Sequence, residues 1–143
     1  MLGLPMNRWP MHRLLCFFLL IPALLSCAGV AERVRLAKFD STFEVYDITL
    51  RRSQFRAAAD FIDPAVRDEK IDYKIYDNIK VVDFKVTHLK VSEDRFNVEQ
   101  VVALQYFLLD RNVLKTIEYR QLWNFDEAKG VWLLRTPLPT FDH

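Results

Sequence analysis

The chain has 143 residues, of which 51% are apolar and 27% charged, and its formal net charge is +1. This length fits one domain. The apolar content excludes a disordered chain, which combines low hydrophobicity with high net charge. The near-zero charge gives no electrostatic basis for nucleic-acid binding. Residues 1–26 contain Arg8, Arg13 and no acidic residue, which leaves 18 basic and 19 acidic residues from Cys27 onward. The sequence therefore predicts a small, near-neutral domain after an apolar leader with basic residues at its start.

Residues 14–25 form an apolar run directly after the basic stretch, which is the layout of a secretory signal peptide. A bilayer-spanning helix needs about 20 apolar residues, and Pro22 interrupts this shorter run. The run ends in Leu24-Leu25-Ser26-Cys27, which resembles the bacterial lipoprotein signal. The resemblance implies a signal peptide over residues 1–26, cleavage before Cys27 and a diacylglyceryl group on that cysteine. An uncleaved N-terminal anchor is the alternative.

The residue after the cysteine is Ala28 rather than aspartate, which in Gram-negative lipoproteins is associated with export to the outer membrane. The resemblance thus implies a lipid anchor at Cys27 in the outer membrane, a tether over residues 27–33 and a domain facing the periplasm. Cys16 and Cys27 are the two cysteines of the chain. A domain that begins after them has no internal disulfide, no thiol chemistry and no thiolate zinc site.

Apolar residues between Val34 and Leu50 recur every three to four positions, which predicts an amphipathic helix. Val45 and Ile48 would widen its apolar stripe. Ser53 is placed to cap a second helix over residues 54–62. The Asp63-Pro64 pair should end that helix, because the residue before a proline is disfavoured in helical conformation.

From residue 71 onward the pattern changes to that of strands. Four runs rich in β-branched and aromatic residues are separated by polar turns, and they cover residues 79–91, 95–109, 114–125 and 131–134. The alternation slips at Thr87-His88, which predicts a β-bulge. Residues 34–143 are thus predicted to form an α+β domain with N-terminal helices packed on a curved antiparallel four-stranded meander.

This domain resembles the nuclear transport factor 2-like, or cystatin-like, superfamily, and in particular its small bacterial lipoproteins. Three segments carry the resemblance: Phe55–Pro64, Gln121–Asp126 and Gly130–Pro139. The resemblance implies a cone formed by helices over a curled sheet. It does not imply one function, since this fold hosts enzymes, carriers and assembly modules.

One predicted site is a ligand cavity inside the cone. Its candidate residues are aromatic, apart from one glutamine: Phe43, Tyr46, Phe84, Tyr106, Tyr119, Gln121 and Trp123. Gln121 would need a hydrogen-bond partner, for which a helix end is one candidate. His88 is the mid-domain histidine and a candidate general base beside a tyrosine, or else a solvent-facing residue. The residues predict neither a metal site nor a cofactor.

The second predicted site is the other face of the sheet. The run 95–109 is apolar on both faces in its second half, and one of those faces needs a partner. Its candidates are Val101, Ala103, Phe107 and Leu109. Lys80, Lys85 and Lys90 lie along the predicted strand 79–91, as solvated surface or as a contact with anionic lipid headgroups.

The sequence thus favours a non-enzymatic binding or assembly module of the cell envelope, which forms a homodimer or docks on another envelope protein. The alternatives are a binder of small hydrophobic ligands and a lyase- or isomerase-type enzyme.

Overall fold

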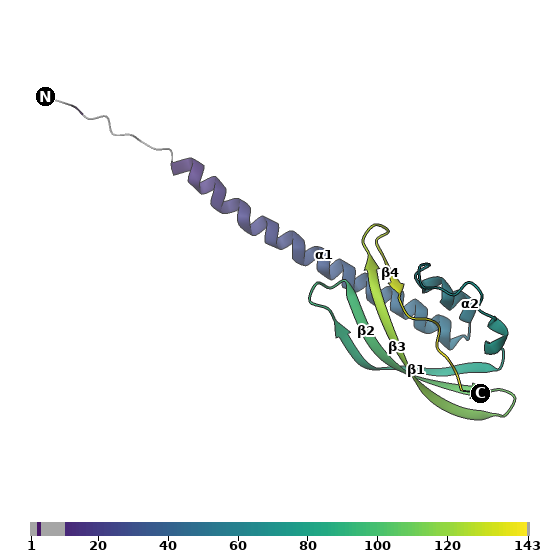
Figure 1. Cartoon of the computed structure of the whole chain (residues 1–143). Helices are drawn as coiled ribbons and strands as arrows, with labels where there is room; N and C mark the ends of the chain where they lie inside the picture. Colours follow the sequence, from purple (N-terminus) through teal and green to yellow (C-terminus); the bar gives the residue numbers. More distant parts are fainter. Residues whose placement is uncertain (1–2, 4–10, 143) are drawn as a thin grey trace. The chain divides into compact units, whose positions relative to one another are not determined.

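A computed structural model describes residue 3 and residues 11–142, with the backbone alone given for residues 11–27. The chain divides into two compact units, Met1–Val34 and Arg35–His143. Helix α1 (Met11–Arg51) supplies the first unit with its helix and the second unit with its first element (Figure 1). None of the helices among the described residues is long and apolar enough to span a bilayer.

The predicted leader falls in the first unit. Residues 4–10 lie outside the described residues, and so does the side chain of Cys27. The segment expected to be a tether, residues 27–33, has helical backbone and belongs to α1. Cleavage and lipidation at Cys27 stay predictions.

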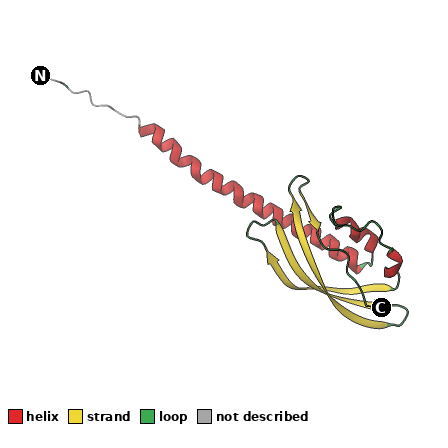
Figure 2. Cartoon of the chain, viewed as in Figure 1, coloured by secondary structure: helices red, strands yellow, loops and turns green. Residues whose placement is uncertain are grey.

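The second unit is an α+β domain, as predicted. Its sheet has four antiparallel strands in the order β1 (Ile79–Val91), β2 (Asn97–Leu108), β3 (Val113–Asp126) and β4 (Val131–Leu134). Along the chain, three short helices follow α1 and precede β1: α2 (Phe55–Ala58), η1 (Ala59–Phe61) and η2 (Tyr73–Tyr76). Figure 2 shows long, curved strands and the short helices clustered near one end of the sheet.

The core lies between the sheet and residues 35–51 of α1. We call the sheet face that carries the core the inner face and the opposite one the outer face. On β2 every second side chain is buried, from Val98 to Leu108. Phe39, Tyr46 and Leu50 of α1 pack into the same core. The predicted helical stripe is correct at these positions and wrong at Val45 and Ile48, which are 53% and 41% exposed.

Strand β1 bends at two irregularities. The register with β2 shifts between Val86 and His88, which confirms the predicted bulge, and again between Val81 and Asp83, which the sequence pattern did not indicate. Bulges bend a strand and interrupt its ladder, and they are common at sheet edges. β1 is an edge strand, so both bulges also disturb the edge that another chain could extend.

The connection after α1 differs from the prediction. Ser53 does not cap α2, whose N-cap is Gln54 with no side-chain hydrogen bond. Ser53 instead adopts a left-handed conformation (φ 57°), and its Oγ accepts a hydrogen bond from the buried backbone N–H of Val81. The helical segment ends at Phe61, just before Asp63-Pro64, and Ile62 is extended and bridges Leu134.

Candidate functional site

The residues predicted to line a cavity form the packed core of the domain. Six of the seven are buried and Phe43 is half-buried. Their rings contact one another and their neighbours: the centroids of Tyr46 and Trp123 lie 5.3 Å apart, and those of Phe43 and Phe84 lie 5.5 Å apart. Aromatic pairs in this range attract each other beyond the effect of burial. These side chains therefore fill the part of the space between α1 and the sheet that the predicted cavity would occupy.

Two buried tyrosines share a hydrogen bond across this core. The hydroxyl oxygens of Tyr46 and Tyr119 lie 3.0 Å apart, and the Tyr119 hydroxyl donates to the carbonyl oxygen of Pro137 at 2.8 Å. Burial raises the pKa of both phenols well above the ordinary value. Both hydroxyls thus stay protonated at neutral pH, so neither can act as a general base.

Gln121 is fully buried and lies on the inner face directly opposite Gln100. Its Oε1 accepts hydrogen bonds from Gln100 Nε2 at 2.6 Å and from Trp123 Nε1 at 3.0 Å. These partners lie on strands rather than at a helix end, which was the partner considered from the sequence. Among the described residues, no acceptor pairs with Gln121 Nε2.

The C-terminal segment closes one end of the core, which the sequence pattern did not indicate. Phe141 is buried with its ring 4.7 Å from that of Tyr106 and 5.5 Å from that of Phe55. The Tyr106 hydroxyl also bonds both the backbone N–H and the carbonyl of Asp142, each at 3.1 Å. The apolar Leu138 and Phe141 beyond the last strand were the available signal.

His88 is exposed and lies on the outer face, paired with Val101. Tyr46, Tyr106 and Tyr119 lie on the inner side, so the sheet separates the histidine from each tyrosine that could assist it. Among the described residues no group of three His, Cys, Asp or Glu side chains could hold a metal ion. The described geometry therefore does not place His88 beside Tyr46, Tyr106 or Tyr119.

The predicted interface residues lie on the outer face. Val101, Ala103 and Phe107 are half-buried on β2, and Leu109 follows the strand with 57% of its surface exposed. Leu114, the β3 partner of Phe107, is 47% exposed. Phe107 and Leu114 thus form an apolar pair across two neighbouring strands, whereas the β3 partners of Val101 and Ala103 are Arg120 and Glu118.

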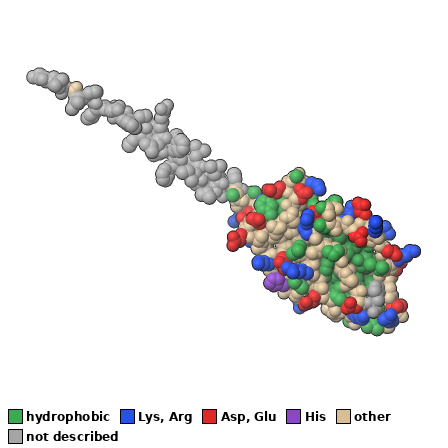
Figure 3. Space-filling view, viewed as in Figure 1, with side chains coloured by type: hydrophobic (Ala, Val, Ile, Leu, Met, Phe, Trp, Pro, Cys, Tyr) green, Lys and Arg blue, Asp and Glu red, His purple; other side chains and the backbone are tan. Residues whose placement is uncertain are grey.

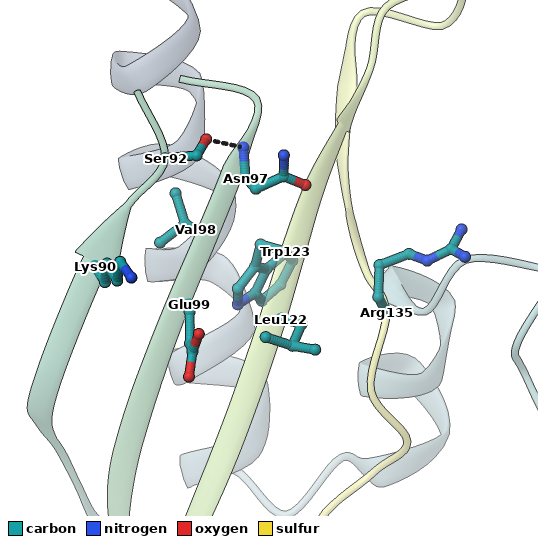
Figure 4. A pocket seen from close by; sticks show the side chains of 8 residues that line it. All are labelled: Lys90, Ser92, Asn97, Val98, Glu99, Leu122, Trp123 and Arg135. Atoms are coloured by element: carbon teal, nitrogen blue, oxygen red, sulfur yellow. Dashed lines mark hydrogen bonds between the residues drawn. The ribbon is translucent and has the colours of Figure 1, made fainter. Parts of the chain in front are cut away.

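A pocket of about 380 Å³ lies toward the other end of the sheet, and it is lined both by outer-face residues and by Val98 and Trp123 of the inner face. One cross-strand row runs through it: Lys90 on β1, Glu99 on β2, Leu122 on β3 and Arg135 just after β4. Figure 4 shows Lys90 and Arg135 on opposite sides, with Glu99 and Leu122 between them. The sequence pattern does not predict this row, because its four residues come from separate segments. Arg135 joins it through the hydrogen bond from its backbone N–H to the Leu122 carbonyl.

The charges of this row differ in how they are paired. Glu99 binds Arg120 at 2.6 Å, and Arg135 pairs with Asp63. Lys90 forms no ion pair with any described residue. In the view of Figure 3, acidic and basic side chains are interspersed over the domain, so the visible face does not carry a single sign of charge.

Comparison with known proteins does not identify a relative, so a functional assignment has to be argued from this geometry. No family model, no curated protein and no solved structure matches the chain.

Proposed function

We propose that this chain is a lipid-anchored protein of the cell envelope, whose α+β domain is a non-enzymatic module that binds a partner through the outer face of its sheet. The observation that carries the proposal is the set of apolar side chains on the outer face, Val101, Ala103, Phe107, Leu109 and Leu114, of which Leu109 and Leu114 are 57% and 47% exposed. Exposed apolar side chains on the open face of a sheet favour an interaction site.

The interior supports the same choice. A carrier or a lyase of the proposed nuclear transport factor 2-like fold would use the space between helices and sheet. Here the aromatic residues at those positions contact one another and fill that space. The surface is thus a better candidate site than the interior.

Membrane attachment follows from the leader and its cysteine. The Leu24–Cys27 sequence supports lipidation of Cys27 and export toward the outer membrane, where the domain would face the periplasm. More than one acyl chain gives stable anchoring where a single chain does not. A tethered domain meets its partners at high effective concentration, so a modest interface is sufficient.

The test of the module is charge insertion on the outer face. Phe107→Glu should abolish self-association or cross-linking to an envelope protein, because it places a carboxylate in the apolar surface. Ile75→Glu is the matched control, since Ile75 is 51% exposed on η2. Unchanged association of the Phe107→Glu variant would refute the proposal. For the anchor, Cys27→Ala should abolish incorporation of a labelled fatty acid, and retained labelling would refute lipidation at that position.

A further inference from the structure

Strand β3 has an edge that is only partly paired. β4 pairs with residues 123–126 of β3, and the long β3 continues past the short β4 (Figure 1). After β4 the C-terminal segment leaves this edge and crosses the inner face, where the hydroxyls of Tyr119 and Tyr106 donate to its carbonyl oxygens. On the side away from β2, residues 114–120 therefore have no described strand beside them.

The direction of the backbone groups along this edge follows from two hydrogen bonds. In an antiparallel sheet the N–H and C=O of one residue point to the same side, and successive residues alternate. The Phe125 N–H bonds the Phe96 carbonyl on the β2 side, and the Leu122 carbonyl accepts from Arg135 on the opposite side. Even-numbered residues of β3 therefore direct their backbone groups to the open edge. Among the described residues, no hydrogen bond reaches these groups on four of them: Leu114, Thr116, Glu118 and Arg120.

The opposite edge of the sheet is less suited to pairing. β1 has two register irregularities, and the Val81 N–H on its outer side already bonds the Ser53 hydroxyl. β3 keeps an unbroken register with β2 over residues 113–124. A regular edge with free backbone groups is a template for another strand. The open edge of β3 is therefore the better candidate for strand pairing.

A second copy of this chain supplies a strand that fits this edge. Antiparallel pairing about a two-fold axis at Ile117 places Leu114 opposite Arg120 and Thr116 opposite Glu118, in both directions. The free N–H and C=O groups of all four residues are then bonded. No like charges lie directly opposite each other, which would be destabilising. The half-buried Ile117 side chains of the two copies meet at the axis.

The neighbouring registers fit less well. An axis at Glu118 places two carboxylates directly opposite each other, and it requires the Leu122 carbonyl, which Arg135 already occupies. An axis at Thr116 places Arg120 opposite Asn112, which lies in the turn before β3 with a left-handed φ of 53°. The axis at Ile117 is the one that uses the whole open edge.

We propose that two copies of this chain pair along residues 114–120 of β3, antiparallel about Ile117, and so join their two four-stranded sheets into one. The contact lies at the sheet edge and leaves the outer face open, so it goes beyond the proposed function. A ladder of four residue pairs is small beside a stable interface, which buries about 1,200–2,000 Å². The pair is therefore weak in solution and is best detected by a covalent trap.

Disulfide trapping tests both the contact and its register. The protein is the full chain in neutral detergent with Cys16 and Cys27 replaced by serine, one new cysteine introduced and copper phenanthroline as oxidant. Ile117→Cys should cross-link to itself, because the opposed Cα atoms lie about 4.5 Å apart, within reach of a disulfide. Thr116→Cys and Glu118→Cys should each fail to dimerise alone, since their copies lie more than about 7 Å apart, but should cross-link when mixed.

The mixed pair keeps the test decisive if Ile117→Cys impairs folding, because Thr116 and Glu118 are both exposed. Equal cross-linking of all three single variants would overturn the proposal as random collision. Absence of both the Ile117→Cys dimer and the mixed product would also overturn it.

Proline substitution tests the edge hydrogen bonds. Thr116→Pro removes an N–H that faces the open edge, which a folded monomer tolerates, and should slow the Ile117→Cys cross-link about tenfold. Leu89→Pro is the matched control on β1, because Leu89 pairs with Gln100, whose backbone groups face β3, so the Leu89 N–H also points outward. Equal slowing by both prolines, or none by Thr116→Pro, would overturn the proposal.

Two products separate this inference from the proposed function: the disulfide at position 117 reports the edge, and cross-links to envelope proteins report the outer face. If the edge disulfide forms while Phe107→Glu leaves the envelope cross-links unchanged, the edge pairing stands and the proposed function fails. If Phe107→Glu abolishes the disulfide and Thr116→Pro does not, the copies meet through the outer face and the edge proposal is overturned. In intact cells, a disulfide from position 117 to a different protein alone would also overturn it.

Discussion

The buried glutamine pair allows a stability prediction with a defined sign. In Gln121→Leu, the donors Gln100 Nε2 and Trp123 Nε1 both lose their acceptor. Each unpaired buried donor costs about 1–3 kcal/mol. Leucine also removes Gln121 Nε2, which has no partner among the described residues, and that relieves a cost of about 1–3 kcal/mol. The net loss in free energy of unfolding is therefore about 1–3 kcal/mol, or roughly 4 °C in Tm for each kcal/mol.

The double variant Gln100→Leu with Gln121→Leu gives the sharper test. It removes the Gln100 donor as well, so Trp123 Nε1 is the donor left without an acceptor. We expect it to be more stable than Gln121→Leu alone by about 1–3 kcal/mol, because replacing both members of a buried pair is less costly than replacing one.

The assay is urea unfolding of the full chain in neutral detergent, followed by tryptophan fluorescence and far-UV circular dichroism. Gln105→Leu is the matched control, since it makes the same change on the outer face of β2 and should alter stability by less than about 0.5 kcal/mol. A double variant less stable than Gln121→Leu by the full cost of Gln100→Leu would show that the two amides do not interact, and would refute the reasoning.

Three further predictions concern stability. Ser53→Ala should lower the free energy of unfolding by about 1–3 kcal/mol, because the buried N–H of Val81 loses its acceptor while the left-handed backbone remains; an unchanged urea midpoint would contradict this. The hydrogen bond from the Ala65 backbone N–H, together with Arg135, lowers the pKa of Asp63 in the folded protein. The ionised Asp63 therefore stabilises the fold fully above its pKa in the unfolded chain, near about 4, and this stabilisation is lost as pH falls through the folded pKa. Wild type should therefore lose more of its Tm below pH 4 than Asp63→Asn does, and parallel pH profiles would contradict the assignment. Burial raises the pKa of Tyr46 and Tyr119, so their stabilisation is present below pH about 10 and is lost at higher pH. Absorbance at 295 nm should show both phenols ionising only as the protein unfolds in alkali; their ionisation in the folded state would contradict it.

The strands could be predicted because their patterns are local. Alternation along residues 95–109 and 114–125 places Tyr106, Tyr119 and Trp123 on one face, and the structure confirms that this face is buried. The bulge near His88 was visible as a break in that alternation. By contrast, the bulge at Val82 leaves no clear break, because Val81 and Val82 are both apolar.

The parts that escaped prediction depend on contacts distant in sequence. Ser53 looked like a helix cap, since serine is common there, yet its hydroxyl bonds a strand residue 28 positions away. The buried position of Phe141 follows from α2 and η2 meeting the end of β2. The pocket row joins four separate segments, which no local pattern could align.

The central claim is that a partner covers the outer face of the sheet, and a photo-crosslinking residue at position 107 tests it most directly. With the full chain expressed in intact cells, position 107 should cross-link to a discrete protein, and the same residue at position 75 should not. If the account is correct, that product also disappears when Val101 is changed to Glu. Cross-linking at position 107 to lipid alone, or to the same proteins as at position 75, would contradict it.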